Sequence, residues 1–263
     1  ERYNFMLPKE DTAYDFEPDI IISVDVADEK LFGESLAEKY AGKTDLCIDH
    51  HISNTGYAKE LCLDGKAAAA CQVVYEILKE MAICITREIA ICLYTGIATD
   101  TGCFMYDNVS PRTLRIAAEI MEQHKDIPYA IINRNMFIVK SMGRMKLDKI
   151  LIEQLESYID GKCMLVCITK KLIEKYGIDE SELEGIASFP LQVEGVQVGI
   201  VLKEREDNVF RISMRSADNV NVSEICKNFG GGGHAKAAGC CIESSAEEAK
   251  KMLVDAVMKG MQK

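Results

Sequence analysis

Short apolar runs, each followed at once by acids or histidines, are the main feature of the first fifty positions. Residues 17–28 (EPDIIISVDVAD) and 43–51 (KTDLCIDHH) have this pattern, and residues 29–40 between them carry apolar side chains at helical spacing. A strand, a helix and a second strand with short joins predict a parallel α/β sheet. Ligands of such sheets bind beyond the carboxyl ends of the strands, where both polar clusters fall.

The rest of the chain predicts more helices and then a second α/β unit. Ser110-Pro111 is typical of a capped helix start, with Pro at the first helical position. We expect helices over 66–82, 86–98, 142–158, 222–229 and 246–259, and strands in KCMLVCIT, VQVGIVLKER, VFRISMRS and GCCIE.

These elements indicate an α/β protein of two domains. We predict an N-terminal parallel-sheet domain over 1–135, a helical connector over 136–158 and a smaller α/β domain over 159–263. The active-site cleft is expected between the two domains.

Charge and composition narrow the class of ligand. The 263 residues are 48% hydrophobic and 28% charged, with a formal net charge of −11. Proteins that grip long duplex nucleic acid show broad basic surfaces, so we expect no such partner here. A small anionic substrate held by local donors and metal ions remains compatible, because bound cations dominate the field inside a site. No apolar run approaches the roughly 18 residues of a membrane span, so no membrane partner is expected.

The eleven cysteines are dispersed, and no C-x-x-C pair occurs. Without a signal-peptide pattern, we interpret them as reduced, mostly buried thiols of a cytoplasmic protein. The residues expected to be buried are Cys47, Cys71, Cys84, Cys92, Cys163 and Cys167.

Three acids and two histidines carry the candidate chemistry of the first domain. Asp49-His50-His51 follows a buried strand, and an imidazole with neighbouring carboxylates can bind a divalent metal. Asp25 ends the other strand, where metal ligation is favoured, whereas Asp28 fits a helix N-cap. Asp100 in GIATDTGCF is the third acid, for which a cap or turn role is the alternative.

A second group of candidate site residues lies in the C-terminal half of the chain. Gly230 to Gly233 followed by His234 suggests a backbone loop that wraps an anion, since glycine frees the N–H groups of side chains. His234 can donate to a phosphate, and Arg215 near the end of FRISMRS is a guanidinium clamp for the same group. An exposed surface arginine is the alternative reading of Arg215.

In this order the motifs resemble the DHH phosphoesterase superfamily joined to its DHH-associated C-terminal domain, in its branch of bacterial oligoribonucleases and phosphoadenosine phosphate phosphatases. The resemblance is carried by VDVAD (24–28), DHH (49–51), ATDTGCF (98–104), RS (215–216) and GGGGHAKAAG (230–239).

The resemblance implies a role for each motif. Asp25 would bridge two manganese ions (Mn²⁺), and His50 and Asp100 would complete the ligands. Asp49 would support the cluster, and His51 would face the substrate phosphate as a catalytic residue. In the second domain, the substrate-binding residues would be Arg215, Gly231, Gly232, Gly233 and His234.

One family motif is absent: the His and D-x-D acids that follow the first strand. Asp11, Asp15 and Asp19 have the wrong context and no companion His. We expect the first strand and its motif to lie upstream of Glu1.

The sequence therefore predicts a manganese-dependent phosphoesterase that cuts short oligoribonucleotides to mononucleotides, or 3′-phosphoadenosine 5′-phosphate to AMP. The rivals are a cyclic di-AMP or pApA phosphodiesterase and, if the first motif is truly absent, a non-catalytic nucleotide-binding protein. Pyrophosphatase or exopolyphosphatase activity and cleavage of long single strands are disfavoured. A homodimer is the default expectation from base rates.

Overall fold

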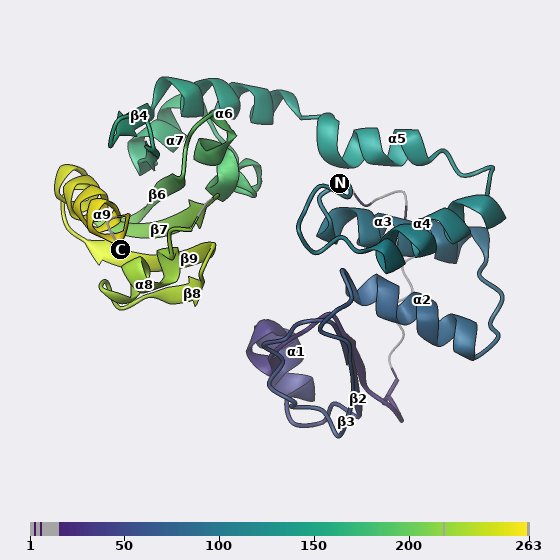
Figure 1. The fold of residues 1–263 in the computed structure, drawn as a ribbon. Helices are drawn as coiled ribbons and strands as arrows, with labels where there is room; N and C mark the ends of the chain where they lie inside the picture. Colours follow the sequence, from purple (N-terminus) through teal and green to yellow (C-terminus); the bar gives the residue numbers. More distant parts are fainter. Residues whose placement is uncertain (1–2, 4–5, 7–15, 218, 262–263) are drawn as a thin grey trace. The chain divides into compact units, whose positions relative to one another are not determined.

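The protein forms two compact units in the computed structural model, Glu1–Val139 and Lys140–Lys263 (Figure 1). The structure describes residues 3, 6, 16–217 and 219–261. The finer limits expected from the sequence, with a connector over 136–158 and a cleft between the domains, stay predictions.

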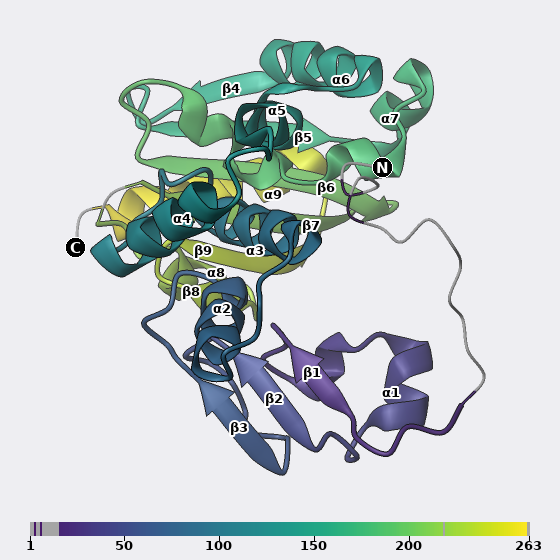
Figure 2. The same cartoon turned by 90° about the vertical axis from the view of Figure 1, so that its right-hand side faces the viewer.

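A three-stranded parallel sheet begins the described part of the first unit (Figure 2). Its order is β1-β2-β3, and Ile22, Ser23 and Val24 stand opposite Leu46, Cys47 and Ile48. The elements of this unit are β1 (Ile22–Val24), a 3₁₀ helix (Glu29–Leu31), α1 (Glu34–Tyr40), β2 (Leu46–Asp49), β3 (Glu60–Leu63), α2 (Ala70–Glu80), α3 (Arg87–Asp100), α4 (Pro111–Gln123), α5 (Tyr129–Asn133) and a π-helical turn (Arg134–Ile138).

Helices α2 to α5 supply the core of the first unit. Tyr75 of α2, Ile97 of α3 and Ile120 of α4 are almost fully buried in one apolar cluster. Ser110 caps α4 through a capping box with Thr113, and Pro111 follows at the first turn, as the sequence predicts. This packing holds the last turn of α3, which carries Asp100, in a fixed position.

The second unit is built on a six-stranded mixed sheet. Its order is β4-β5-β6-β7-β9-β8, with β5 and β6 parallel and the other pairs antiparallel. The elements are α6 (Met142–Glu153), β4 (Leu155–Tyr158), β5 (Cys163–Ile168), α7 (Lys170–Tyr176), 3₁₀ helices (Glu180–Leu183 and Ile186–Gln192), β6 (Val198–Glu206), β7 (Val209–Ser216), α8 (Val222–Lys227), β8 (Gly232–His234), β9 (Ala237–Glu243) and α9 (Ala246–Gly260).

Alternation along β7 separates the two faces of this sheet. Phe210, Ile212 and Met214 are buried in the cluster that α8 and α9 complete. On the other face, Leu147 and Leu151 of α6 pack against Val166 and Val201. The odd-numbered residues of β7 lie on this second face and are less buried, which leaves polar side chains there within reach of a ligand.

The α/β class and the parallel first sheet are confirmed, whereas several predicted boundaries are wrong. Strand β1 has three residues because the chain turns at Asp25, and the helix predicted over 29–40 breaks at Gly33, whose φ is 74°. The predicted helix over 142–158 ends at Glu153, and residues 155–158 pair with β5 as β4. The cysteines are free, but Cys84 and Cys92 are exposed rather than buried.

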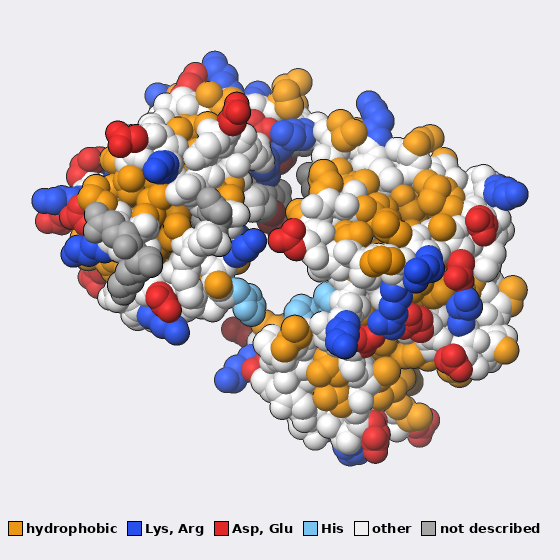
Figure 3. All heavy atoms as spheres, in the orientation of Figure 1, with side chains coloured by type: hydrophobic (Ala, Val, Ile, Leu, Met, Phe, Trp, Pro, Cys, Tyr) orange, Lys and Arg blue, Asp and Glu red, His pale blue; other side chains and the backbone are white. Residues whose placement is uncertain are grey.

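Acidic and basic side chains are interspersed over the face seen in Figure 3, where the described residues form no broad basic surface. Hydrophobic side chains gather over the helices of the first unit in the same view; Leu114 of α4 and Ile131 of α5 are 50% and 57% exposed. Among the described residues, no helix is both long enough and apolar enough to span a bilayer.

Candidate metal centre and phosphate-binding strand

The carboxyl end of β1 presents Asp25 through a backbone turn. Asp25 has φ 64°, in the left-handed region that non-glycine residues rarely adopt, and its N–H donates to the Ile48 carbonyl at 3.0 Å. Such a conformation costs about 1–3 kcal/mol and persists where the surroundings enforce it, often at functional sites. The side chain, 47% exposed, is thereby directed away from the strand and toward His50.

Asp49 ends β2 and is enclosed, with a fully buried side chain. Its Oδ1 accepts from the backbone N–H of His50 at 2.7 Å and lies 2.7 Å from His51 Nδ1. Its Oδ2 accepts from Asn54 Nδ2 at 2.6 Å. Burial acts to raise the pKa of Asp49, but the hydrogen bonds from Asn54 and His51 outweigh it and lower that pKa. Asp49 is therefore a charged anchor that orients the two histidines.

His50 is held so that one ring nitrogen faces the acids. Its Nδ1 lies 3.2 Å from the Ala67 carbonyl, an acceptor, so Nδ1 carries the proton and donates. In the neutral ring, Nε2 then has its lone pair free. This Nε2 lies 3.3 Å from Asp25 Oδ1 and 3.6 Å from Asp100 Oδ2. A main-chain carbonyl on the far nitrogen is the usual support of a metal-binding histidine.

Asp100 is the last residue of α3, not a residue beyond it as the sequence suggested. A carboxylate at a helix C-terminus faces the negative end of the helix dipole, so a capping role does not account for it. Burial, and the charge of Asp25 after it, raise the pKa of Asp100 above its ordinary value. Repulsion between the two acids is the reason that a cation would be favoured between them.

The turn after α3 is strained and firmly held. Gly102, Cys103 and Phe104 have φ of 55°, 58° and 64° in succession. The buried Thr101 hydroxyl donates to the Ile97 carbonyl at 2.7 Å and accepts from the Phe104 N–H at 3.1 Å. These bonds fix the turn that follows Asp100.

The acids and histidines fit a divalent cation. Ligand atoms of Asp25, Asp49, His50 and His51 all lie within 4.8 Å of one another, and Asp100 joins them through its contact with His50. The Asp25 carboxylate, more than any other group, raises the pKa of His50, while burial opposes it. Among the described residues, no lysine or arginine pairs with Asp25 or Asp100, so the acids lack a cationic side-chain partner.

The thiol of Cys71, whose pKa both Asp25 and Asp100 influence, is unsuited to metal binding. Burial, with smaller contributions from Asp100 and Asp25, raises the pKa of Cys71 to about 11. It stays protonated at neutral pH, and only thiolates are good ligands. The donor set is thus oxygen and imidazole nitrogen, which suits a hard or borderline cation better than a thiolate zinc site.

In the second unit, Arg215 lies on β7, on the less buried face of the sheet. It is opposite Gly199 of β6 and Ala237 of β9, and its Nη1 donates to the Met214 carbonyl at 2.9 Å. Burial lowers the pKa of this guanidinium. His234 ends β8, is exposed, and pairs with Ala237. Arg215 and His234 therefore both stand opposite the same residue of β9, one on each neighbouring strand.

Part of the glycine run, which the sequence predicts as an anion-wrapping loop, is a strand. Gly232, Gly233 and His234 form β8 against β9. A Cβ on Gly231 would lie 2.2 Å from the Gly239 carbonyl oxygen, and one on Gly233 would lie 2.5 Å from that of Ala237. Close approach of two backbones thus requires glycine at 231 and 233, whereas at Gly232 a Cβ would meet nothing within 4 Å.

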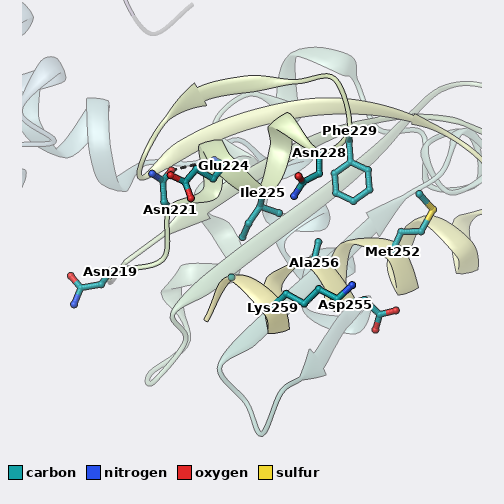
Figure 4. Close-up of a pocket in the computed structure, with 11 residues that line it drawn as sticks. Asn219, Asn221, Glu224, Ile225, Asn228, Phe229, Met252, Asp255, Ala256 and Lys259 are labelled. Carbon is teal, nitrogen blue, oxygen red and sulfur yellow. Dashed lines mark hydrogen bonds between the residues drawn. The ribbon is translucent and has the colours of Figure 1, made fainter. Parts of the chain in front are cut away.

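A separate recess of 820 Å³ lies between α8 and α9 (Figure 4). It is lined by Asn221, Asn228, Phe229 and Lys259, among others, and by none of the predicted site residues. The acids Glu224 and Asp255 outnumber Lys259 there, so this recess does not suit a phosphate.

Two family models match the chain. The DHH family, N-terminal domain, matches residues 1–97, and the DHHA1 domain matches residues 160–262. The chain belongs to the DHH superfamily with a DHH-associated C-terminal domain. The enzyme class expected from the sequence, a metal-dependent phosphoesterase, follows from this membership.

Relatives of this DHH protein agree on the branch. It is 29% identical over 236 residues to the probable bifunctional oligoribonuclease and PAP phosphatase NrnA of Streptococcus mutans, covering 89% of this chain and 73% of that protein. It is 31% identical to the bifunctional oligoribonuclease and PAP phosphatase NrnA of Thermus thermophilus, covering 80% of this chain and 62% of that one. An exopolyphosphatase-related protein from Bacteroides fragilis has a similar fold, with a TM-score of 0.82 and 26% identity over 92% of this chain and 72% of that one.

The structure brings Asp25, Asp49, His50, His51 and Asp100 together in the first unit, and Arg215 near the β8–β9 pair in the second. The assigned role of each stays a prediction. Asp28 caps the 3₁₀ helix, with its side chain accepting from the Lys30 N–H at 3.0 Å, as expected. Asp19 is exposed, and Asp11 and Asp15 lie outside the described residues.

Sequence reasoning missed the residues that support the DHH cluster. Asn54 holds Asp49, and Asn108 donates to the carbonyls of Ala68 and Asp100, both at 3.0 Å. Asn108 thus joins the loop that orients His50 to the helix end that carries Asp100. Asn54 lies five residues after Asp49, a spacing that could have been noticed in the sequence. The Asn108 bridge has no local sequence signature.

Proposed function

We propose that the protein is a manganese-dependent phosphoesterase that hydrolyses short oligoribonucleotides to mononucleotides and 3′-phosphoadenosine 5′-phosphate to AMP. One observation supports it above the others: Asp25, His50 and Asp100 come from three distant segments and meet at one point. His50 Nε2 lies 3.3 Å from Asp25 Oδ1 and 3.6 Å from Asp100 Oδ2. The names of the NrnA relatives from Streptococcus mutans and Thermus thermophilus supply the substrate class.

In this proposal Asp25, His50 and Asp100 hold the metal. Bound divalent cations would lower the pKa of a water and stabilise charge on the phosphate oxygens. Asp49 keeps His51 in place through Nδ1, so the other ring nitrogen, Nε2, is free to face the substrate phosphate. In the second unit, Arg215 and His234 bind a terminal phosphate of the substrate, where the exposed β8 strand leaves room for it.

Strand β1 is open on one face and at one edge among the described residues. Ile22 and Val24 of β1 are 54% and 46% exposed, although parallel strands are normally covered on both faces. β1 is also an edge strand among the described residues. A segment that lies against this strand and carries the His and D-x-D acids of the first family motif would complete the metal site.

The test uses the full-length protein with manganese, magnesium and zinc supplied separately. We expect manganese-dependent cleavage of di- to pentanucleotides and of 3′-phosphoadenosine 5′-phosphate, and loss of at least 10³-fold, about 4 kcal/mol of barrier, in Asp25→Asn. The matched control is Asp28→Asn, which removes an acid three residues away but keeps a residue type that caps a helix. Equal activity of Asp25→Asn and Asp28→Asn would refute the proposed metal site.

The same assay separates the rivals. Turnover of pApA or cyclic di-AMP well above that of longer RNA would favour a cyclic-dinucleotide pathway enzyme. Tight nucleotide binding without any turnover, under all three metals, would favour a non-catalytic binding protein.

A further inference from the structure

A second group of cations lies on the same sheet face as Arg215. Because side chains alternate along a strand, Arg211, Ser213 and Arg215 of β7 all point to one face. Lys203 of β6 stands directly opposite Arg211 on that face, as Val201 stands opposite Ser213. Arg211 is exposed.

This pairing works against the stability of the fold. Like charges directly opposite each other in an antiparallel pair are destabilising. Glu180 compensates in part, with its Oε1 3.4 Å from Lys203 Nζ, but this acid is 74% exposed. Neither Arg211 nor Arg205 has an ion-pair partner in the part of the chain that the structure describes. Arg205 and Arg211 thus add positive charge beside Lys203 without an ion pair of their own among the described residues.

The cations line a recess of 330 Å³. The strands contribute Lys203, Arg205, Arg211 and Ser213 to its lining. Residues of the segment 180–187 line it as well, including the acids Glu180 and Glu184. The three cations outnumber the two acids of the lining, and Glu180 pairs with Lys203. The two arginines are therefore the donors available to a phosphate, for whose oxygens Arg offers paired N–H groups.

The distance from Arg215 fits an oligonucleotide. Four residues separate Arg211 from Arg215 along one extended strand, which corresponds to about 13 Å. The floor between them is made of small residues, since Ser213 has Gly239 as its neighbour on β9. A single nucleotide held at Arg215 does not reach this recess, whereas the next phosphates of a longer strand do.

We propose that the recess of Lys203, Arg205 and Arg211 is a second phosphate-binding site, which takes an internal phosphate of oligonucleotides of three or more residues. The inference rests on the proposed function and adds a determinant of substrate length to it. It makes a short oligonucleotide, rather than 3′-phosphoadenosine 5′-phosphate, the substrate that uses the whole sheet face.

The experiment compares two substrates on the full-length protein with manganese. For Arg211→Ala combined with Arg205→Ala, we expect KM for a pentaadenylate to rise about tenfold or more, the loss of one good phosphate contact. KM for 3′-phosphoadenosine 5′-phosphate should stay within twofold. The matched control is Lys251→Ala, which removes an exposed cation from α9, on the opposite side of the sheet.

Salt dependence provides a readout that a purely structural role would not change. Each lost contact with a single-strand phosphate should reduce the slope of log KM against log salt by about 0.7. The double variant should therefore show a shallower slope for pentaadenylate, and Lys251→Ala should not.

Two results would overturn the second site: unchanged KM for pentaadenylate, or an equal rise for both substrates. If the wild-type protein hydrolyses neither substrate, the proposed function fails on its own. The recess is then tested by fluorescence anisotropy of labelled pentaadenylate, where equal affinity of wild type and double variant would refute it.

Discussion

Asn54→Ala tests whether Asp49 is the buried anchor of the candidate site. Asp49 is fully buried, and among the described residues its Oδ2 accepts a hydrogen bond only from Asn54, at 2.6 Å. A hydrogen bond to a charged group contributes about 1.5–3 kcal/mol, and a buried carboxylate oxygen left without a donor also bears its desolvation cost. We expect a loss of about 2–3 kcal/mol in the free energy of unfolding, a fall of roughly 5–10 °C in the Tm of the first unit.

The assay is calorimetric unfolding with a chelator present, in which the transition of the first unit is identified by its upward shift when manganese is restored. Ser53→Ala is the control, because Ser53 is adjacent and exposed, and its side chain makes no hydrogen bond within the described part of the chain. A surface change of this kind stays within about 0.5 kcal/mol. If Asn54→Ala unfolds no earlier than Ser53→Ala, Asp49 does not depend on this amide and the anchor argument is wrong.

Three further predictions concern other contacts. Gly231→Ala should lower the unfolding free energy of the second unit by about 1–3 kcal/mol in chemical denaturation, because its Cβ would lie 2.2 Å from a backbone atom. Gly232→Ala should change this free energy by less than about 0.5 kcal/mol. Equal losses would contradict the close-approach argument. Asn108→Ala should weaken manganese binding about tenfold in a calorimetric titration with little change in Tm, and unaltered affinity would exclude it as a positioning residue. The Arg112 guanidinium, more than any other group, lowers the pKa of Asp64. This acid therefore contributes stability above its unfolded pKa of about 3.9, and the contribution is lost as pH falls through the folded value. The difference of about 1 kcal/mol in unfolding free energy between wild type and Asp64→Asn, measured in urea, should shrink below about pH 4, and a difference independent of pH would refute the linkage.

Elements with a strong local signature were predictable from the sequence. The alternation of VFRISMRS gives β7 with its bounds, and Ser110-Pro111 gives the start of α4. Asp28 as a cap follows from its place after a strand and before a helix. In each of these cases the residues that decide the structure lie within a few positions of one another.

Strand β8 was missed because its stability comes from a partner and not from its own residues. Glycine has a low strand propensity, and Gly232 to His234 pair only because β9 lies alongside. Similarly, β3 is a run of only four residues, and its place in the sheet comes from its pairing with β2. The role of the Ala67 carbonyl in orienting His50 also escaped, since a backbone acceptor leaves no mark on the sequence.

The two candidate sites carry an excess of opposite charge, and this is the strongest physical reason to assign them to one substrate class. In the first unit, burial and then the charge of Asp25 raise the pKa of Asp100, and a divalent cation would remove the repulsion between the two acids. In the second, Lys203 and Arg211 oppose each other across two strands, a cost that an anion would remove. The net charge of −11 does not indicate this local group of cations, because a net charge sums over the whole chain and carries no information about where the charges lie. A phosphate ester is the kind of ligand whose single reacting group calls for both: cations at the phosphorus that is attacked, and guanidinium donors at the phosphates that are only held.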